Sequence, residues 1–181
     1  MERGRIIVIT GPPGTGKSTV SAIVAKDSCM EKSVHMHTDD FYHYLSKGAI
    51  LPHLPESNEQ NLIVIEAFLE AAKRYARGGY DVIVDGIIGP WFLQPWLNIV
   101  HEGYEVHYII LRASKVETLN RATGRLKLDS ETNTELVEVM WEQFHHLGVY
   151  ERNAIDTTND SIQDTVSAIN EKISNKTALL L

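Results

Sequence analysis

The sequence has little cysteine, little positive charge and no long hydrophobic run. Cys29 is the only cysteine among the 181 residues, so no disulfide can form within the chain. The longest apolar runs are the length of strands, well short of the roughly 18 residues that a membrane span needs. No apolar signal segment precedes the first apolar strand, which starts at Arg5. These absences predict a cytoplasmic protein that does not span a membrane.

The charge balance limits the partners. The 24 Asp and Glu residues outnumber the 17 Lys and Arg residues, which gives a net charge of −7 at pH 7. Such a chain repels a polyphosphate backbone unless its positive side chains gather in one place. We therefore expect no extended nucleic acid as a partner, whereas a single nucleotide is compatible with the composition.

Length and periodicity predict the fold class. A chain of 181 residues with 43% hydrophobic side chains is typical of one globular domain, here expected over residues 1–181. Alternating strands and helices predict an α/β fold, with a parallel sheet and helices on both faces. The expected strands are residues 5–10, 33–38, 80–85, 105–111 and 154–157.

Three predicted helices have a start signal. Ser57, Ser114 and Thr132 are each followed three residues later by Gln or Glu, which is the pattern of a capping box. From Ser57 the apolar residues recur at helical spacing until two glycines at 78–79 end the pattern. The preceding connector contains two prolines, and we expect residues 48–61, including His53 and Asn58, to shape an acceptor site.

The strongest functional signal follows the first predicted strand. Residues 11–18 match G-x-x-x-x-G-K-S, the phosphate-binding loop or P-loop. Glycines let consecutive backbone N–H groups turn toward phosphate oxygens at the start of the next helix. Lys17 can reach the β- and γ-phosphates, and Ser18 can bind Mg²⁺. The expected nucleotide-binding residues are Gly11, Pro12, Pro13, Gly14, Thr15, Gly16, Lys17, Ser18 and Thr19.

Acidic residues follow the second and third predicted strands, at the sheet edge where ligands of such folds bind. Asp39 and Asp40 could hold a Mg²⁺-bound water and accept a hydroxyl proton, or one of them could cap a helix. Asp85, followed by Gly86, has the position of a carboxylate near Mg²⁺, with a loop cap as the alternative. We expect all four residues to bind substrate, and Ser18, Asp39 and Asp85 to surround the metal.

Two arginines follow the fourth predicted strand. Arg121 and Arg125 lie one helical turn apart and share a face, so they could clamp the transferred phosphoryl group. The alternative is a solvated basic face. The polar residues after Arg125 are suited to a moving segment, so we expect a lid at about 121–135.

Histidine and tryptophan residues permit two interpretations. His35 and His37 share one face of a strand, as a metal-binding pair would. Because no further ligand is evident in the sequence, we interpret them as packed or hydrogen-bonded side chains rather than as zinc ligands. Trp91 and Trp96 could line a pocket or belong to the core.

Five segments together resemble the small P-loop kinases that include chloramphenicol phosphotransferase, gluconate kinase, shikimate kinase and the zeta toxins. The resemblance spans nearly the whole chain and is strongest to the chloramphenicol phosphotransferase type. It implies a three-layer P-loop NTPase fold with strand order 2-3-1-4-5 and a small helical lid. The segments are residues 9–19, 37–42, 82–90, 111–125 and 154–161.

The resemblance also implies roles for particular residues. Asp39 would act as the base on the acceptor hydroxyl, and Arg121 and Arg125 would be the lid arginines. Thr157 and Thr158, after the last strand, would lie beside the adenine, with Arg121 also binding the nucleotide. Together with Lys17 for catalysis, these residues predict a kinase that uses ATP and Mg²⁺.

The expected activity is transfer of the γ-phosphoryl group to a hydroxyl of a small metabolite or antibiotic. Two alternatives stay open. One is a kinase for a nucleotide sugar or a polynucleotide end, which needs a larger acceptor site. The other is a non-catalytic switch that binds ATP and changes shape.

Overall fold

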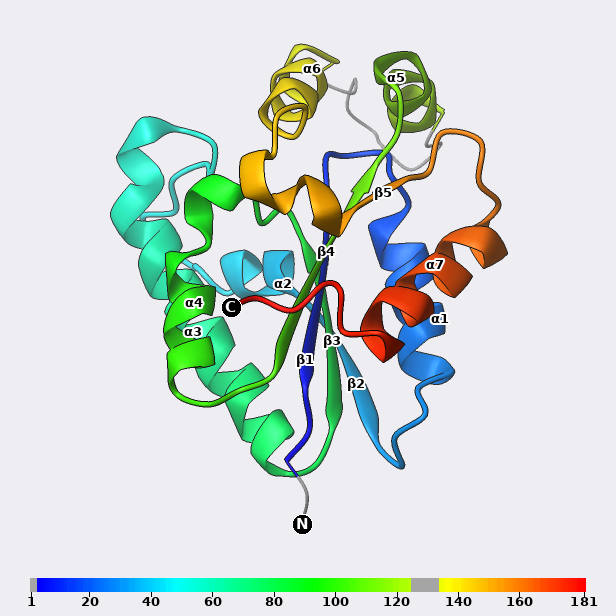
Figure 1. Cartoon of the computed structure of the whole chain (residues 1–181). Coiled ribbons are helices and arrows are strands. Elements are labelled where there is room, and N and C mark those ends of the chain that lie inside the picture. Colours follow the sequence, from blue (N-terminus) through cyan, green and yellow to red (C-terminus); the bar gives the residue numbers. More distant parts are fainter. Residues whose placement is uncertain (1–2, 125–133) are drawn as a thin grey trace.

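Five parallel strands form the central sheet of the computed structural model, which describes residues 3–124 and 134–181. Their order in space is β2-β3-β1-β4-β5, so β1 lies at the centre of the sheet (Figure 1). This confirms the predicted fold class and strand order. The strands are β1 (Ile6–Thr10), β2 (Ser33–His37), β3 (Asp81–Gly86), β4 (Val106–Arg112) and β5 (Ala154–Asp156).

Helices cover both faces of the sheet because the central strands are apolar on both sides. On one face, alternate residues such as Ile9 and Ile83 pack against α1 (Lys17–Lys26) and α7 (Ile162–Ser174). On the other face, Val8 and Val84 pack with α3 (Asn58–Arg77) and α4 (Gln94–His101). Figure 1 shows these two helix pairs on opposite sides of the strands. Trp96 belongs to the second core and is fully buried.

The carboxyl end of the sheet carries the remaining helices. Helix α2 (Thr38–His43) directly follows β2, and α5 (Lys115–Thr123) and α6 (Thr134–Gln143) lie above the sheet (Figure 1). Lys115 bridges α5 to α6 by ion pairs with Glu138 at 3.0 Å and Glu142 at 3.3 Å. Most of the expected lid, including Arg125, lies outside the described residues. The short helical turns are η1 (Pro55–Ser57), η2 (Pro90–Phe92) and η3 (Gly148–Asn153).

The predicted capping box at Ser57 is wrong. Helix α3 does follow Ser57, but its hydroxyl donates to the carbonyls of Pro52 and Leu54, at 2.8 and 2.7 Å. The Gln60 amide exchanges two hydrogen bonds with the backbone of Ile50, both at 2.8 Å. Both side chains therefore fasten the proline-containing connector onto α3 instead of capping the helix.

The other capping signals have different outcomes. The Ser114 hydroxyl accepts from the backbone N–H of Glu117, as predicted, which is half of a capping box. Thr132 lies outside the described residues. A complete box that the sequence analysis did not identify begins α7, where Ser161 and Asp164 cap each other's backbone N–H groups. Asp, instead of the more common Glu or Gln, closes this box.

The C-terminal tail completes the edge of β4 that the short β5 leaves free. Strand β5 pairs only with residues 110–112 of β4. Nearer the start of β4, the N–H of Tyr108 donates to the carbonyl of Ala178 at 2.8 Å, and the N–H of Leu180 donates to the carbonyl of Val106 at 2.9 Å. An antiparallel bridge joins His107 to Leu179 between these bonds.

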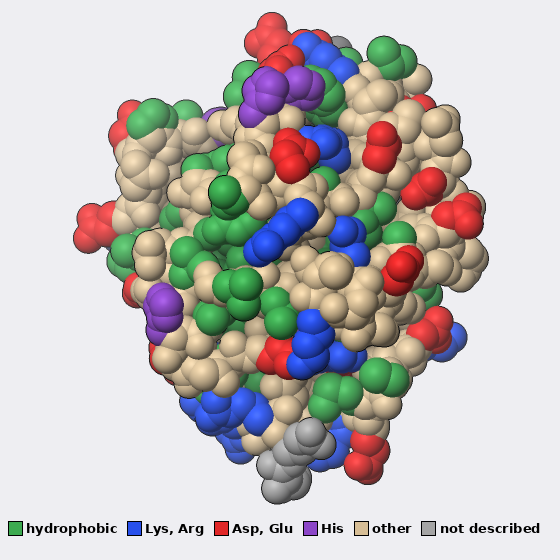
Figure 2. Space-filling view, viewed as in Figure 1, with side chains coloured by type: hydrophobic (Ala, Val, Ile, Leu, Met, Phe, Trp, Pro, Cys, Tyr) green, Lys and Arg blue, Asp and Glu red, His purple; other side chains and the backbone are tan. Residues whose placement is uncertain are grey.

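The surface has mixed charge on the side that Figure 2 shows. Lys and Arg side chains of the described residues are interspersed there with Asp and Glu, and they form no continuous stripe. Among the described helices, none is both long enough and apolar enough to cross a membrane.

Candidate active site

The P-loop connects β1 to α1 at the centre of the carboxyl edge. Gly14 and Gly16 both have φ near +85°, a left-handed conformation that side chains disfavour. A Cβ atom at Gly14 would lie 2.7 Å from the Thr118 carbonyl, so α5 packs directly on the loop. The Thr15 hydroxyl and the Lys17 ammonium both donate to the Pro12 carbonyl, at 3.0 and 2.9 Å. The loop is therefore tightly wound, with the positive end of α1 open for anions.

Asp39 and Asp40 lie together in the first turn of α2. Strand β2 ends at His37 and the helix begins at Thr38, so no loop separates the two elements. Both carboxylates are exposed, and the position before the helix is occupied by His37, which makes no side-chain cap. Neither acid therefore occupies the N-cap position, which was the alternative expected for one of them. Each acid can stabilise the helix start through its charge.

Gly86 allows α2 to approach β3. A Cβ atom built on Gly86 would lie only 1.9 Å from Oγ1 of Thr38, which no real side chain permits. Thr38 is itself buried, with 4% of its surface exposed. This contact brings Asp39 and Asp40 close to the end of β3.

Asp85, at the end of β3, is buried and charged. Burial raises the pKa of this carboxyl, but the contacts with His35 and Ser18 and the charge of His37 lower it further, so the net shift is downward. Nδ1 of His37 lies 2.5 Å from Oδ1 of Asp85. The Ser18 hydroxyl and the Asp85 carboxylate thus lie next to each other, and both offer oxygen atoms, the donor type that Mg²⁺ prefers.

A cavity of about 370 Å³ lies between the P-loop, α2 and the end of β3. It brings Pro13, Lys17 and Ser18 of the P-loop together with the four residues at the ends of β2 and β3 that were expected to bind substrate, and adds His37 and Ile87. Its size is within the range of sites for small molecules. The lining residues are Pro13, Lys17, Ser18, His37, Asp39, Asp40, Asp85, Gly86 and Ile87.

A second group of predicted residues meets on the α5 side of the P-loop. Nη2 of Arg121 donates to the carbonyls of Thr157 at 2.9 Å and Thr158 at 3.2 Å. Nε of Arg121 donates to Glu117 at 2.6 Å, and the Arg121 side chain lies against Gly14. Arg121 therefore joins α5 to the loop after β5, but it does not line the cavity.

Several predicted residues lie away from the cavity. Thr19 is exposed on the first turn of α1, and His53 and Asn58 are exposed on the connector and at the start of α3. None of the three lines the cavity. Trp91 is 54% exposed and packs edge-on against Phe144.

His37 is a polar residue whose place in the cavity the sequence did not predict. The spacing of His35 and His37 was visible in the sequence, but its third partner was not. Asp85 stands opposite His37 in the parallel β2–β3 ladder, 48 positions along the chain. Only the register of the two strands could have revealed the group.

Comparison with known proteins agrees with this geometry. A family model described as an AAA domain matches residues 7–165. Cytidylate kinase of Sulfurisphaera tokodaii is 28% identical over 165 residues, which cover 89% of this chain and 84% of the relative.

Two solved structures share the fold. The tunicamycin resistance protein of Deinococcus radiodurans has a TM-score of 0.66 at 21% identity, covering 94% of this chain and 96% of that one. A gluconokinase from Sinorhizobium meliloti has a TM-score of 0.64 at 18% identity, covering 97% and 96%. The chain therefore belongs to the AAA domain family of nucleotide-binding P-loop proteins and has the fold of the P-loop kinases, as the sequence resemblance implied.

Proposed function

We propose that this chain is a kinase that uses ATP and Mg²⁺ to phosphorylate a hydroxyl group of a small molecule, either a metabolite or an antibiotic. The observation that carries the proposal is the cavity. It places a P-loop lysine and serine opposite three carboxylates at the carboxyl edge of a parallel sheet. A switch protein needs a carboxylate for Mg²⁺ but no further acid, whereas a phosphoryl acceptor needs a group that orients its hydroxyl, and the cavity holds two carboxylates besides Asp85.

The phosphate side of the cavity would position ATP. Lys17 would neutralise the β- and γ-phosphates, and the P-loop N–H groups would hold their oxygens. Ser18 and Asp85 would hold Mg²⁺, with Asp39 facing it across the cavity. A bound Mg²⁺ supplies charge neutralisation and a fixed orientation of the phosphates. Arg121, with Thr157 and Thr158, would bind the nucleotide on the α5 side of the loop.

The acceptor side of the cavity would be formed by α2. Asp39 would orient the acceptor hydroxyl and accept its proton as the phosphoryl group is transferred. Its charge is felt nearby, since burial and then the charge of Asp39 raise the pKa of Tyr42 to about 12. Asp40 would bind other polar groups of the acceptor. Positioning and charge neutralisation would supply most of the rate enhancement.

The charge of the cavity favours a hydroxyl over a phosphate as the acceptor. Among the described residues that line it, Lys17 is the one side chain with a permanent positive charge, against three carboxylates. A phosphate acceptor would meet these carboxylates with like charge. The similarity to cytidylate kinase nevertheless makes a nucleoside monophosphate the second candidate acceptor.

A product screen separates the two candidates. The protein is incubated with ATP and Mg²⁺ and with CMP, GMP, gluconate, tunicamycin or a metabolite extract, and new phosphorylated products are identified by mass spectrometry. We expect a phosphorylated alcohol. Lys17→Ala is the control and should remove it. A diphosphate formed from CMP or GMP would instead show that the second candidate is correct.

Asp39 and Asp40 form a matched pair for testing the acceptor side. Asp39→Asn keeps the shape but cannot accept a proton, so transfer should fall by about 10²- to 10⁴-fold with ATP affinity retained. Asp40→Asn should mainly remove a favourable charge at the start of α2, at a cost of about 1 kcal/mol or less. Single-turnover rates and urea unfolding of both variants provide the comparison. Wild-type rates in Asp39→Asn would reject its assignment as the base.

A further inference from the structure

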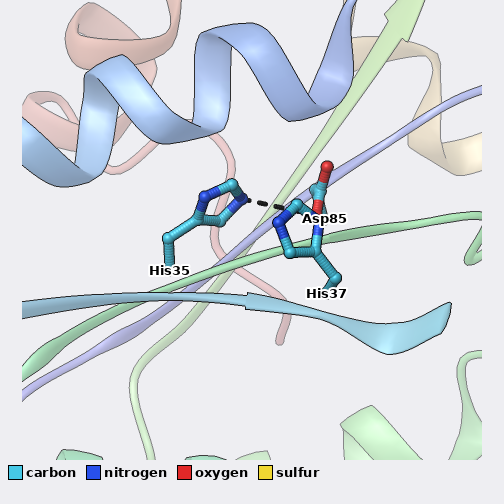
Figure 3. Close-up of side chains that lie close together, drawn as sticks. All are labelled: His35, His37 and Asp85. Carbon is cyan, nitrogen blue, oxygen red and sulfur yellow. Dashed lines mark ion pairs between the residues drawn. The ribbon is translucent and has the colours of Figure 1, made fainter. Parts of the chain in front are cut away.

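His35, His37 and Asp85 form a cluster on the face of β2 and β3 that α1 covers (Figure 3). The two histidines are two positions apart on β2, so their side chains share a face. Asp85 is the register partner of His37 on β3. One ligand atom from each residue can be chosen so that all three lie within 4.8 Å of one another.

The cluster is built into the protein rather than exposed on its surface. The Asp85 side chain is 3% exposed, the His35 side chain 17% and the His37 side chain 40%. The planes of the two imidazole rings are tilted by 51° to each other, with their centroids 4.2 Å apart. His37 and Asp85 also line the cavity, so the cluster has access to solvent from one side.

Two buried atoms of the cluster lie close to each other without a well-aligned hydrogen bond. Nε2 of His35 lies 3.4 Å from Oδ1 of Asp85, the contact that the dashed line in Figure 3 marks. Neither atom has a well-aligned hydrogen bond to any described residue. Oδ1 of Asp85 also contacts Nδ1 of His37, but a buried polar atom without a well-aligned hydrogen bond still lowers stability. A cation placed between these lone pairs would satisfy both atoms at once.

The donor set selects the kind of cation. Mg²⁺ prefers oxygen ligands alone, whereas two imidazoles and a carboxylate suit Zn²⁺ and similar divalent transition ions. In a tetrahedral zinc site with bonds of about 2.0 Å, ligand atoms are roughly 3.3 Å apart. The observed 3.4 Å between His35 and Asp85 already matches this spacing. The 2.5 Å between His37 and Asp85 requires a small outward turn of the half-exposed His37 ring.

We propose that His35, His37 and Asp85 form a binding site for a divalent transition metal ion, best represented by Zn²⁺. A water molecule on the cavity side would supply the fourth ligand. A consequence rests on the function proposed above: Asp85 cannot serve Zn²⁺ and the catalytic Mg²⁺ in the same way. Occupancy of the histidine site therefore inhibits phosphoryl transfer.

Metal binding is tested first without nucleotide. Zn²⁺ affinity is measured by competition with a chelating dye, and Co²⁺ is used as a probe whose visible absorption reports nitrogen and oxygen ligands. His35→Gln should weaken Zn²⁺ binding about tenfold or more and remove the Co²⁺ bands. The matched control is His145→Gln, because His145 and His146 form another histidine pair, with ring nitrogens 3.2 Å apart. This control should retain the binding.

Two outcomes would overturn the metal site. One is full Zn²⁺ affinity in folded His35→Gln, and the other is loss of affinity in His145→Gln. Circular dichroism and urea unfolding establish that each variant is folded. If His35→Gln does not fold, His37→Gln tests the same site from the more exposed ligand, and unchanged Zn²⁺ affinity there would equally reject the proposal.

Inhibition is then tested separately. Zn²⁺ should inhibit ATP turnover of the wild-type chain, and His35→Gln should be resistant by about the same factor as its loss of Zn²⁺ affinity. Binding without inhibition would leave the metal site intact and reject the assignment of Asp85 to Mg²⁺. The two proposals therefore fail in distinguishable ways.

Discussion

Strand β3 carries a buried aspartate near each end, and the two side chains have very different partners. Asp81, 1% exposed, receives two hydrogen bonds from Arg5, at 2.9 and 3.1 Å, and one from Ser28 at 2.5 Å. Asp85, 2% exposed, has an oxygen with no well-aligned hydrogen bond among the described residues. Both side chains point to the same face, because they are an even number of positions apart.

The difference separates a structural carboxylate from the one that we propose to be functional. At the amino edge of the sheet, Arg5 and Asp81 satisfy each other, and the hydrogen bond to Asp81 is the main cause of the raised Arg5 pKa. At the carboxyl edge, Asp85 is surrounded by His35, His37 and Ser18. Its carboxylate could bind a metal ion in place of one of these contacts. Burial alone does not tell the two apart, but the remaining hydrogen-bonding capacity does.

The largest effect is expected at the functional end. Asp85→Asn should lower phosphoryl transfer by about 10²- to 10³-fold, since it removes a charge that faces the developing negative charge or its metal. Unfolding free energy should fall by only about 1–2 kcal/mol, because Asn can keep some of the contacts that Asp85 makes with His37 and Ser18. Kinase turnover and urea unfolding of one preparation measure both. A variant that is fully active but unstable would make Asp85 a second structural acid.

A smaller effect is expected at Asp81, and it should appear in stability rather than in activity. Asp81→Asn leaves the Arg5 guanidinium partly buried without its counter-charge, which should cost on the order of 3 kcal/mol of unfolding free energy. ATP affinity should stay within about twofold at a temperature where the variant is folded. Arg5→Met, which removes the unpaired charge, should recover part of the stability in the double variant. If Asp81→Asn changed the free energy of nucleotide binding as much as the free energy of unfolding, Asp81 would not be a purely structural acid.

The smallest effect is expected at Arg121, which combines a structural ion pair with a proposed role in nucleotide binding. Arg121 forms an ion pair with Glu117, and the two side chains are 29% and 35% exposed. Glu117→Gln should therefore change stability by less than about 1 kcal/mol. Arg121→Ala also releases the carbonyls of Thr157 and Thr158 beside the P-loop. It should weaken ATP binding about tenfold, measured by calorimetric titration, with Glu117→Gln as the control.

The fold was predictable because its signals are local or confined to one strand at a time. The P-loop after an apolar strand, the alternation of strand and helix patterns, and the kinase resemblance together led to the observed strand order. The end of α3 was also predicted within a residue, because Gly78 ends the helical pattern there. The prediction of a capping box at Ser57 was wrong because the side chains of Ser57 and Gln60 form hydrogen bonds with the connector. A four-residue pattern does not reveal that the connector competes with the helix N-terminus for these side chains.

The candidate site was predictable only in part, since it depends on register and close approach. Lys17, Ser18 and Asp39 follow from motifs or their place after a strand. The pairing of His37 with Asp85 depends on which residues of two distant strands stand opposite each other. The approach of Thr38 to Gly86 depends on α2 starting without a loop. Pattern reasoning identifies strand ends, but it does not align them with one another.

The contact between β4 and residues 178–180 has a consequence for the behaviour of the protein in solution. An edge strand with free N–H and C=O groups is a template for strands of other molecules, which leads to self-association. The bonds that Ala178 and Leu180 make to β4 occupy these groups near the start of the strand. Removal of the last few residues would expose the apolar start of β4 to neighbouring molecules. A purification tag is therefore better placed at the N-terminus, where it leaves this protective contact undisturbed.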